Sequence, residues 1–180
     1  PTAWQTVAAK ISEVPDPSEG LRILMRQSLA LMLGLLLGYE RESQGKSAGV
    51  RTHMLVALGS ALFVLLPSQM GMALGDLGRV MQGLVAGVGF LCAGTILKHG
   101  GSGGADHIQG LTTAAGLWLT AAIGMACGLG REVTAIITAA LALAVFTLLP
   151  RLVHPGGKRG ADQPGAPHGA IVVAVQRDPP

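Results

Sequence analysis

Hydrophobic residues fall into five long runs, which polar and glycine-rich segments separate. The runs are Leu21–Tyr39, Met54–Leu66, Met81–Leu97, Leu111–Leu129 and Val133–Leu149. A helix rises about 1.5 Å per residue, so about 17 to 25 residues cross a hydrocarbon core of ~30 Å. Four runs reach this length and predict transmembrane helices. The second run spans the bilayer only if its helix begins near Val50 or continues past Pro67.

A soluble protein with buried core helices is the alternative. Such helices keep a polar face, which is nearly absent from Leu84–Leu97 and Ala135–Leu149. Only 13% of the residues are charged, against about 25% in an average soluble domain. The scattered basic residues and an aromatic content of 3% also argue against nucleic acid binding. The chain therefore predicts an all-α, polytopic transmembrane helical bundle of about five spans, with the lipid bilayer around it.

The positions of Lys and Arg predict the orientation, because cytoplasmic loops are enriched in them. With the N-terminus outside, eight basic residues are cytoplasmic: Arg41, Lys46, Arg51, Lys98, Arg151, Lys158, Arg159 and Arg177. Five are external: Lys10, Arg22, Arg26, Arg79 and Arg131. The excess favours an external N-terminus and a cytoplasmic C-terminus.

Both ends of the chain differ from its apolar middle. Residues 1–20 form a polar lead-in, residues 21–152 the membrane domain, and residues 153–180 a cytoplasmic tail rich in Gly and Pro. Within the tail, Ala170–Val175 predicts one β-strand, which is either disordered or the start of a further domain. Because the chain starts at Pro1 and not at Met, we expect a fragment or a processed form.

Small residues recur at four-residue spacing in three of the runs. The pairs are Gly34 and Gly38, Gly83 and Gly87, and Gly124 and Gly128. In lipid, close backbone approach favours helix association, so these pairs predict tight packing within one chain or in a homo-oligomer. A glycine-lined pore or an unwound ion site is the alternative.

All ten acidic residues fall outside the apolar runs. A carrier of Mg²⁺ or protons is expected to hold a carboxylate at membrane depth, so this pattern weakens a transport function. Rings of backbone carbonyls could substitute for carboxylates. The histidines and the two cysteines lack metal-ligand spacing, and no catalytic spacing is present. We therefore expect no metal site, no cofactor and no enzymatic activity.

Four short motifs carry the candidate functional residues. They extend over Gly38–Arg41, Gly49–His53, Gly89–Gly94 and Gly110–Ala115. The composition around Glu40, Arg41 and Arg51 favours a solvated loop whose long side chains reach water. The alternative is a charge pair that locks two helix ends together. Cys92 fits a packing role better than a modifiable thiol, and Thr112 and Thr113 can form hydrogen bonds within or between helices.

In their order and spacing, the motifs resemble the MgtC/SapB family of bacterial inner-membrane proteins over about Leu24–Leu152. The resemblance implies a multi-pass inner-membrane protein with about five transmembrane helices. It also implies magnesium homeostasis, namely adaptation to low Mg²⁺, and virulence in pathogens. The family positions that map here are Glu40, Arg41, Arg51, Thr52, Gly94, Thr112 and Thr113, with Cys92 as a further candidate.

Two functions of different classes follow. The first, which the resemblance favours, is a non-enzymatic regulator that docks on a partner membrane protein through helix–helix contacts, the F-type ATP synthase being a family-level candidate. The second is a transporter or channel for Mg²⁺ or another cation, with backbone carbonyls near Gly87–Gly94 and Thr112–Thr113 as ligands. Many relatives also carry an ACT-like cytoplasmic domain after the last helix, to which only Ala170–Val175 could belong here.

Overall fold

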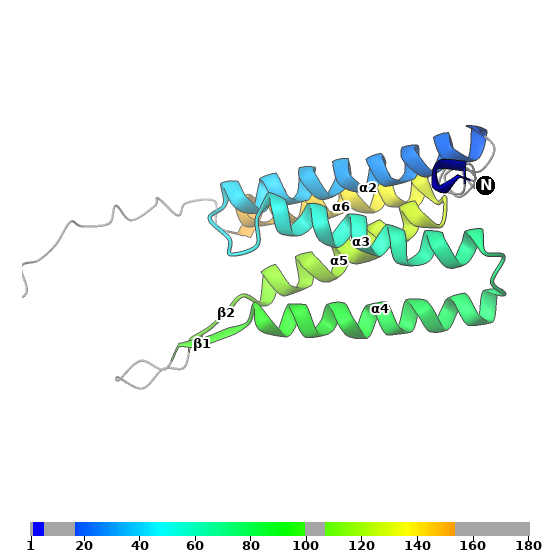
Figure 1. Ribbon diagram of the computed structural model, residues 1–180. Helices are drawn as coiled ribbons and strands as arrows, with labels where there is room; N and C mark the ends of the chain where they lie inside the picture. The colour runs from blue at the N-terminus through cyan, green and yellow to red at the C-terminus, as the bar shows by residue number, and fades with distance from the viewer. Residues whose placement is uncertain (1, 6–16, 100–106, 154–180) are drawn as a thin grey trace, which may run out of the picture.

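Five long helices form most of the computed structural model, which describes residues 2–5, 17–99 and 107–153 (Figure 1). The helices are α2 (Pro17–Ser43), α3 (Val50–Gln69), α4 (Leu74–Gly94), α5 (Leu111–Gly128) and α6 (Glu132–Val153). Between α4 and α5, β1 (Leu97–His99) pairs with β2 (His107–Gln109) in an antiparallel hairpin.

All five helices are long and apolar enough to cross a membrane. Large hydrophobic side chains on their outer faces are exposed, among them Leu55, Phe63, Phe90 and Leu141. Lipid is the environment that such faces require. The predicted fold class, an all-α transmembrane bundle of about five spans, is therefore confirmed, and the protein is a multi-pass membrane protein.

The helix boundaries confirm the sequence prediction for the second span and differ from it elsewhere. α3 begins at Val50 and also continues past Pro67 to Gln69, which gives the second span its 20 residues. α2 continues to Ser43, so it includes Glu40 and Arg41. α4 ends at Gly94, and Leu97 belongs to β1, a strand that the sequence pattern did not predict. The strand predicted at 170–175 lies outside the described residues.

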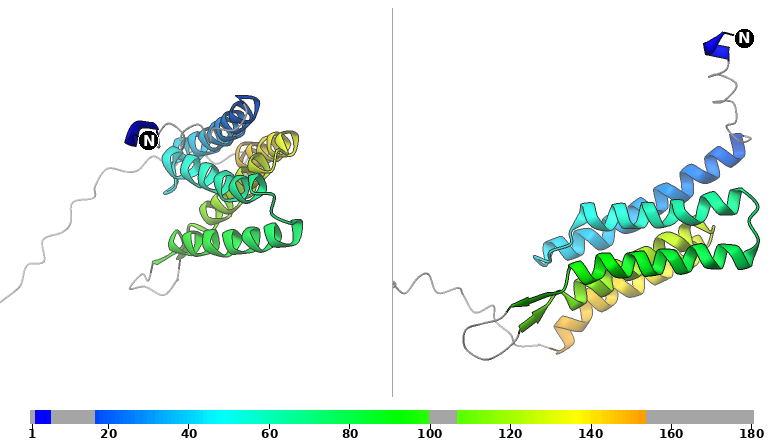
Figure 2. Two further views of the ribbon diagram at one scale, coloured as in Figure 1. Left: turned by 45° about the vertical axis from the view of Figure 1, so that its right-hand side comes forward. Right: turned by 60° about the horizontal axis from the view of Figure 1, so that its bottom comes forward.

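The helices contribute unequally to the bundle. α5 is the most enclosed helix, since 61% of its most apolar stretch is buried, against 17% of the corresponding stretch of α4. Figures 1 and 2 show why: α2, α3, α5 and α6 pack together, whereas α4 lies at one side of the bundle, against α5 and part of α3, with its remaining faces uncovered. α4 is therefore the helix with the most surface available to lipid or to another protein.

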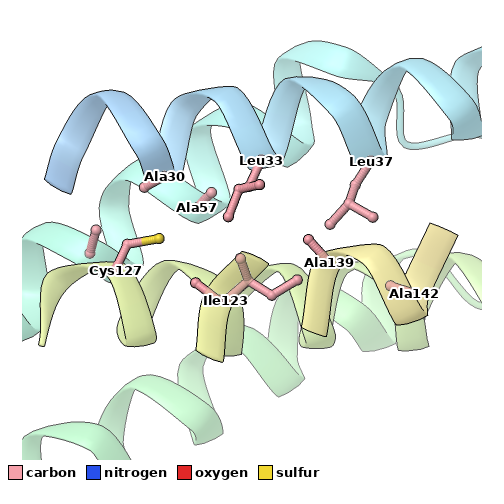
Figure 3. Close-up of a cluster of buried hydrophobic side chains, with 10 residues drawn as sticks. Ala30, Leu33, Leu37, Ala57, Ile123, Cys127, Ala139 and Ala142 are labelled. Atoms are coloured by element: carbon pink, nitrogen blue, oxygen red, sulfur yellow. The ribbon is translucent and has the colours of Figure 1, made fainter. Parts of the chain in front are cut away.

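Small residues fill the core where α2, α3, α5 and α6 meet. Figure 3 shows that Leu33 and Leu37 of α2 lie on the side of Ala139 and Ala142 of α6, whereas Ala30 lies nearer to Ala57 and Cys127, with Ile123 between the two groups. Lipid tails are as apolar as these side chains, so burial alone does not hold the helices together in a membrane. The many alanines stabilise the bundle because they let the helix backbones approach closely.

Two of the three glycine pairs lie at such close approaches. An ideal Cβ at Gly34 would lie 2.8 Å from the His53 carbonyl oxygen, and one at Gly38 would lie 2.6 Å from the Val50 Cα. On α5, a Cβ at Gly124 or Gly128 would overlap the carbonyl oxygen of Ala57 or Ala61. Both pairs thus serve packing against α3 within this chain.

Candidate functional site

The four sequence motifs meet at one end of the bundle, which we call the motif end. It contains the α2–α3 loop, the start of α3, the end of α4, the β hairpin and the start of α5 (Figure 1). Ala48 from the loop packs in one buried cluster with Cys92 of α4 and Ala114 of α5. Segments that are about 60 residues apart in the chain therefore share one small region.

The first two motifs join across the α2–α3 turn. Gly38 permits α2 to approach the start of α3 at Val50. Glu42 then closes the turn, since its Oε2 accepts a hydrogen bond of 2.8 Å from the Val50 backbone N–H. A carboxylate is favourable at this place because the first N–H groups of a helix lack partners and carry partial positive charge.

Glu40 and Arg41 form a buried ion pair, not a solvated one. Their exposed fractions are 8% and 3%, and Arg41 Nη1 lies 3.8 Å from Glu40 Oε2. The Arg41 guanidinium also lies over the Phe146 ring of α6, 4.4 Å from its centroid. The solvated-loop interpretation is therefore wrong for these two residues, because α2 continues past them, both are buried, and Phe146 of α6 covers the Arg41 guanidinium. Arg51 and Thr52, by contrast, are exposed on α3.

His53 places a second polar group inside the bundle, a short distance along α3. Its side chain is fully buried, and Nδ1 lies 2.8 Å from the Thr120 hydroxyl of α5. That hydroxyl donates its own hydrogen to the Gly116 carbonyl oxygen. In the bond between His53 and Thr120, His53 Nδ1 is therefore the donor and the hydroxyl oxygen the acceptor. Gly116 leaves the space that this arrangement needs, since a Cβ there would lie 3.3 Å from Phe146 and 3.7 Å from His53.

We call Glu40, Arg41, His53, Thr120 and Phe146 the buried polar cluster. Within the described part of the chain, Glu40 Oε1 and Oε2, Arg41 Nε and Nη2, and His53 Nε2 have no hydrogen-bond partner. Buried polar atoms normally have one, so the cluster has unused capacity for hydrogen bonds. Sequence reasoning selected Glu40 and Arg41 but not the other three residues. His53 stands in a quoted motif, but its contact with Thr120 joins residues that are 67 positions apart.

The third and fourth motifs join α4 to α5. The Cys92 thiol donates to the Ala114 carbonyl oxygen at 3.1 Å, and the Thr95 hydroxyl donates to the Cys92 carbonyl oxygen at 2.8 Å. Gly110 precedes α5 with φ of 93°, and a Cβ there would overlap the Thr95 carbonyl oxygen. This junction explains why a glycine stands at the start of the fourth motif.

The remaining candidate residues are divided between buried and exposed positions. Thr113 is buried in α5, whereas Thr112 and Gly94 are exposed. A Cβ at Gly83, Gly87 or Gly94 would meet no atom within 4 Å among the described residues. The described segments also contain no group of three His, Cys, Asp or Glu side chains that could hold a metal ion.

Comparison with known proteins identifies the family. The model of the MgtC family matches residues 28–154, which include all four motifs and most of the bundle. The chain belongs to the MgtC family. No solved structure is significantly similar to it.

Curated relatives agree with this assignment. Protein SrpB of Synechococcus elongatus is 44% identical over 118 residues, which cover 61% of this chain and 65% of SrpB. Protein MgtC of Brucella abortus is 41% identical over 141 residues, which cover 75% of this chain and 56% of the relative. For Protein MgtC of Salmonella typhimurium the values are 41% over 120 residues, 67% and 49%. The chain thus spans about half to two thirds of the length of these relatives.

Proposed function

We propose that this MgtC-family protein is a non-enzymatic regulator in the bacterial inner membrane, and that it supports adaptation to low Mg²⁺ by contacting a partner membrane protein through its helices. The observation that supports this function is the different use of the three glycine pairs. Two of them pack α2 and α5 against α3. The pair Gly83 and Gly87 on α4 contacts no other helix of this chain in the described structure.

The free glycine pair lines an apolar groove between α3 and α4. The groove has a volume of about 400 Å³, and its walls include Phe63, Leu84, Val88 and Leu91. A helix that presents small side chains can approach such a surface closely, which is the main source of helix association in lipid. The partner is thus a transmembrane helix, and the F-type ATP synthase is a candidate to supply it.

We place the motif end on the cytoplasmic side. Arg41, Lys46, Arg51 and Lys98 lie at this end or in its connections, whereas Arg22, Arg26, Arg79 and Arg131 lie at the opposite end. In this orientation the buried polar cluster lies toward the cytoplasmic side of the bundle, and it connects α2, α3, α5 and α6 to one another. Its role is to keep the bundle rigid while α4 contacts the partner.

Replacing Gly87 with leucine will test the docking surface. The longer side chain enters the groove and holds a partner helix away, so we expect co-purification of partner subunits to fall about tenfold, the equivalent of ~1.4 kcal/mol. Growth at limiting Mg²⁺ of a bacterial strain that lacks its own MgtC-family protein is the second measurement. The wild-type chain will rescue growth, and the variant will not.

Ala140 offers the matched control. It is exposed on α6, away from the groove, so its replacement with leucine adds a similar side chain to a lipid-facing surface. This variant will rescue growth and retain the same subunits. Equal behaviour of the two variants would contradict docking on α4. A second copy of this chain, instead of another membrane protein, in the co-purified material would assign the groove to homo-oligomerisation.

Cation transport is the second candidate, and one observation favours it. The Glu40 carboxylate is buried in the bundle even though it stands outside the apolar run in sequence, so the membrane domain does contain an enclosed acidic group. Glu40 nevertheless stands three residues before the end of α2, close to the membrane surface. A carboxylate at that level fits a role in holding helix ends better than a role in a pathway through the bilayer centre.

Mg²⁺ influx into liposomes separates the two functions. Purified protein is reconstituted with a trapped fluorescent indicator, beside empty liposomes and a Glu40→Gln variant. Under the proposed function, influx will equal that of empty liposomes. Influx above this level by the wild-type protein would establish transport and overturn the regulator. Loss of that influx in Glu40→Gln protein whose circular dichroism matches the wild type would assign the pathway to Glu40.

A further inference from the structure

A pocket of about 460 Å³ opens between the start of α2 and the end of α3. These two helix ends lie at the end of the bundle opposite the motif end (Figure 1). We call it the arginine pocket. Its lining residues are Ser18, Glu19, Arg22, Ile23 and Arg26 of α2 with Leu65, Ser68 and Gln69 of α3. Residues four apart share one face of a helix, so Ser18, Arg22 and Arg26 form one row along α2.

Helix lengths place the pocket at the membrane surface. α3 has 20 residues, so it is about 30 Å long and ends near the hydrocarbon boundary. Gln69, its last residue, donates a hydrogen bond of 3.4 Å to Glu19. α2 has 27 residues and is about 40 Å long, so its first turns extend beyond that boundary. The row from Ser18 to Arg26 therefore lies at the level of the lipid headgroups.

The two arginines of the pocket differ in their contacts. Arg26 Nε lies 3.5 Å from Glu132 Oε1 of α6, and the same guanidinium lies against Gly130 in the α5–α6 turn. This contact holds Arg26 at the base of the pocket. Arg22 is exposed, and no carboxylate of the described residues lies within ion-pair distance of it.

The charges and donors of the pocket define what it can bind. Glu132 balances the charge of Arg26, and the Glu19 carboxylate accepts a hydrogen bond from Gln69, so the Arg22 guanidinium is the cation of the lining that remains available to a ligand. The hydroxyls of Ser18 and Ser68 add neutral donors, and Ile23 and Leu65 provide an apolar wall. Guanidinium groups match phosphate oxygens in charge and geometry.

We propose that the arginine pocket binds a phosphate group, which either the headgroup of an anionic phospholipid or free phosphate can supply. The site is independent of the docking function proposed for α4, because it lies between different helix faces. The α2 side of the pocket, from Ser18 to Arg26, precedes the region that the family model matches, since that region begins at residue 28. Arg22 makes the direct contact with the phosphate group. Arg26, which Glu132 holds in place, is the second guanidinium donor.

Lipid binding to the full chain in detergent tests the site. Phosphatidylglycerol and phosphatidylcholine are titrated separately, and bound lipid is counted by native mass spectrometry. We expect a preference for phosphatidylglycerol that the Arg22→Gln variant weakens about fivefold, the effect of one basic side chain near a lipid surface. Arg22→Lys keeps the charge and will lose less. Arg79→Gln is the control, because Arg79 stands at the same end of the bundle, on α4, outside the pocket.

A parallel titration with inorganic phosphate, without phosphatidylglycerol, distinguishes the sources. Phosphate binding that Arg22→Gln weakens, without a preference among lipids, would support the site and name free phosphate as its ligand. The proposal is overturned if neither phosphatidylglycerol nor phosphate is preferred, or if Arg79→Gln weakens binding as much as Arg22→Gln.

Discussion

Replacing Gly124 with alanine will destabilise the membrane domain by about 2 to 3 kcal/mol, the upper part of the range for overpacking a core. The added methyl group would overlap the Ala57 carbonyl oxygen and lie 3.0 Å from the Ala57 Cα. These atoms belong to the α3 backbone, which cannot rotate away as a side chain can. α3 and α5 must therefore separate along the surface where α5 is most enclosed. Thermal unfolding of the purified protein, followed by circular dichroism, measures the loss.

Gly87 provides the matched comparison for this prediction. It is also a glycine in the interior of a helix, but a Cβ there would meet no described atom within 4 Å. Alanine favours a helix over glycine by about 1 kcal/mol, so Gly87→Ala should leave stability unchanged or raise it. Equal destabilisation by the two substitutions would show that helix propensity, and not the α3–α5 contact, governs the effect.

Removing one member of the Glu40–Arg41 pair will destabilise the protein by about 3 to 5 kcal/mol, because a charge then remains buried without its partner. Arg41→Leu leaves the Glu40 carboxylate enclosed and also removes the cation–π contact with Phe146. Glu40→Gln leaves the guanidinium enclosed. The double variant, which contains neither charge, should be more stable than Arg41→Leu alone.

A double-mutant cycle of thermal unfolding measures this coupling. Asp76 and Arg79 supply the control pair, since their side chains are 57% and 83% exposed at a separation of 3.7 Å. Exposed pairs contribute about 0 to 1 kcal/mol, so a cycle at these positions should show little coupling. Additive effects at Glu40 and Arg41 would indicate that the two charges are solvated and that the bundle opens at the motif end.

The buried pair also changes the argument about transport. In the sequence, every acidic residue stands outside the apolar runs, which weakened a transport function. In the structure, Glu40 is enclosed by the bundle because α2 extends four residues beyond Tyr39, the end of the predicted run. Transport through the bilayer is still disfavoured, because Glu40 lies near the end of α2 and not at the bilayer centre. The reason is now the depth of the carboxylate, and no longer the absence of an enclosed one.

Hydrophobic patterning was sufficient to predict the number and approximate position of the spans. Run length and the absence of polar faces determine this property, because any segment that crosses lipid must satisfy its backbone hydrogen bonds within itself. The same local information allowed α3 to extend to Val50 and past Pro67. It could not predict the hairpin of β1 and β2, whose pairing depends on where α4 and α5 end relative to each other.

The glycine pairs illustrate a limit of local information. All three have the same four-residue spacing, and nothing in the sequence distinguishes Gly83 and Gly87 from the others. Only the packing showed that two pairs are used against α3 and that the third lies in an open groove. The physical reason is that spacing defines a helix face, whereas the neighbour of that face depends on the whole bundle.

The sequence by itself therefore determined that this is a multi-pass helical membrane protein with its four motifs at or near the ends of the spans. The tertiary structure decided which motif residues are buried, and it brought His53, Thr120 and Phe146 to the Glu40–Arg41 pair. Membrane insertion depends on each segment's own hydrophobicity, which a sequence displays directly. A buried polar cluster depends on contacts between residues far apart in the chain, which arise only when the helices pack.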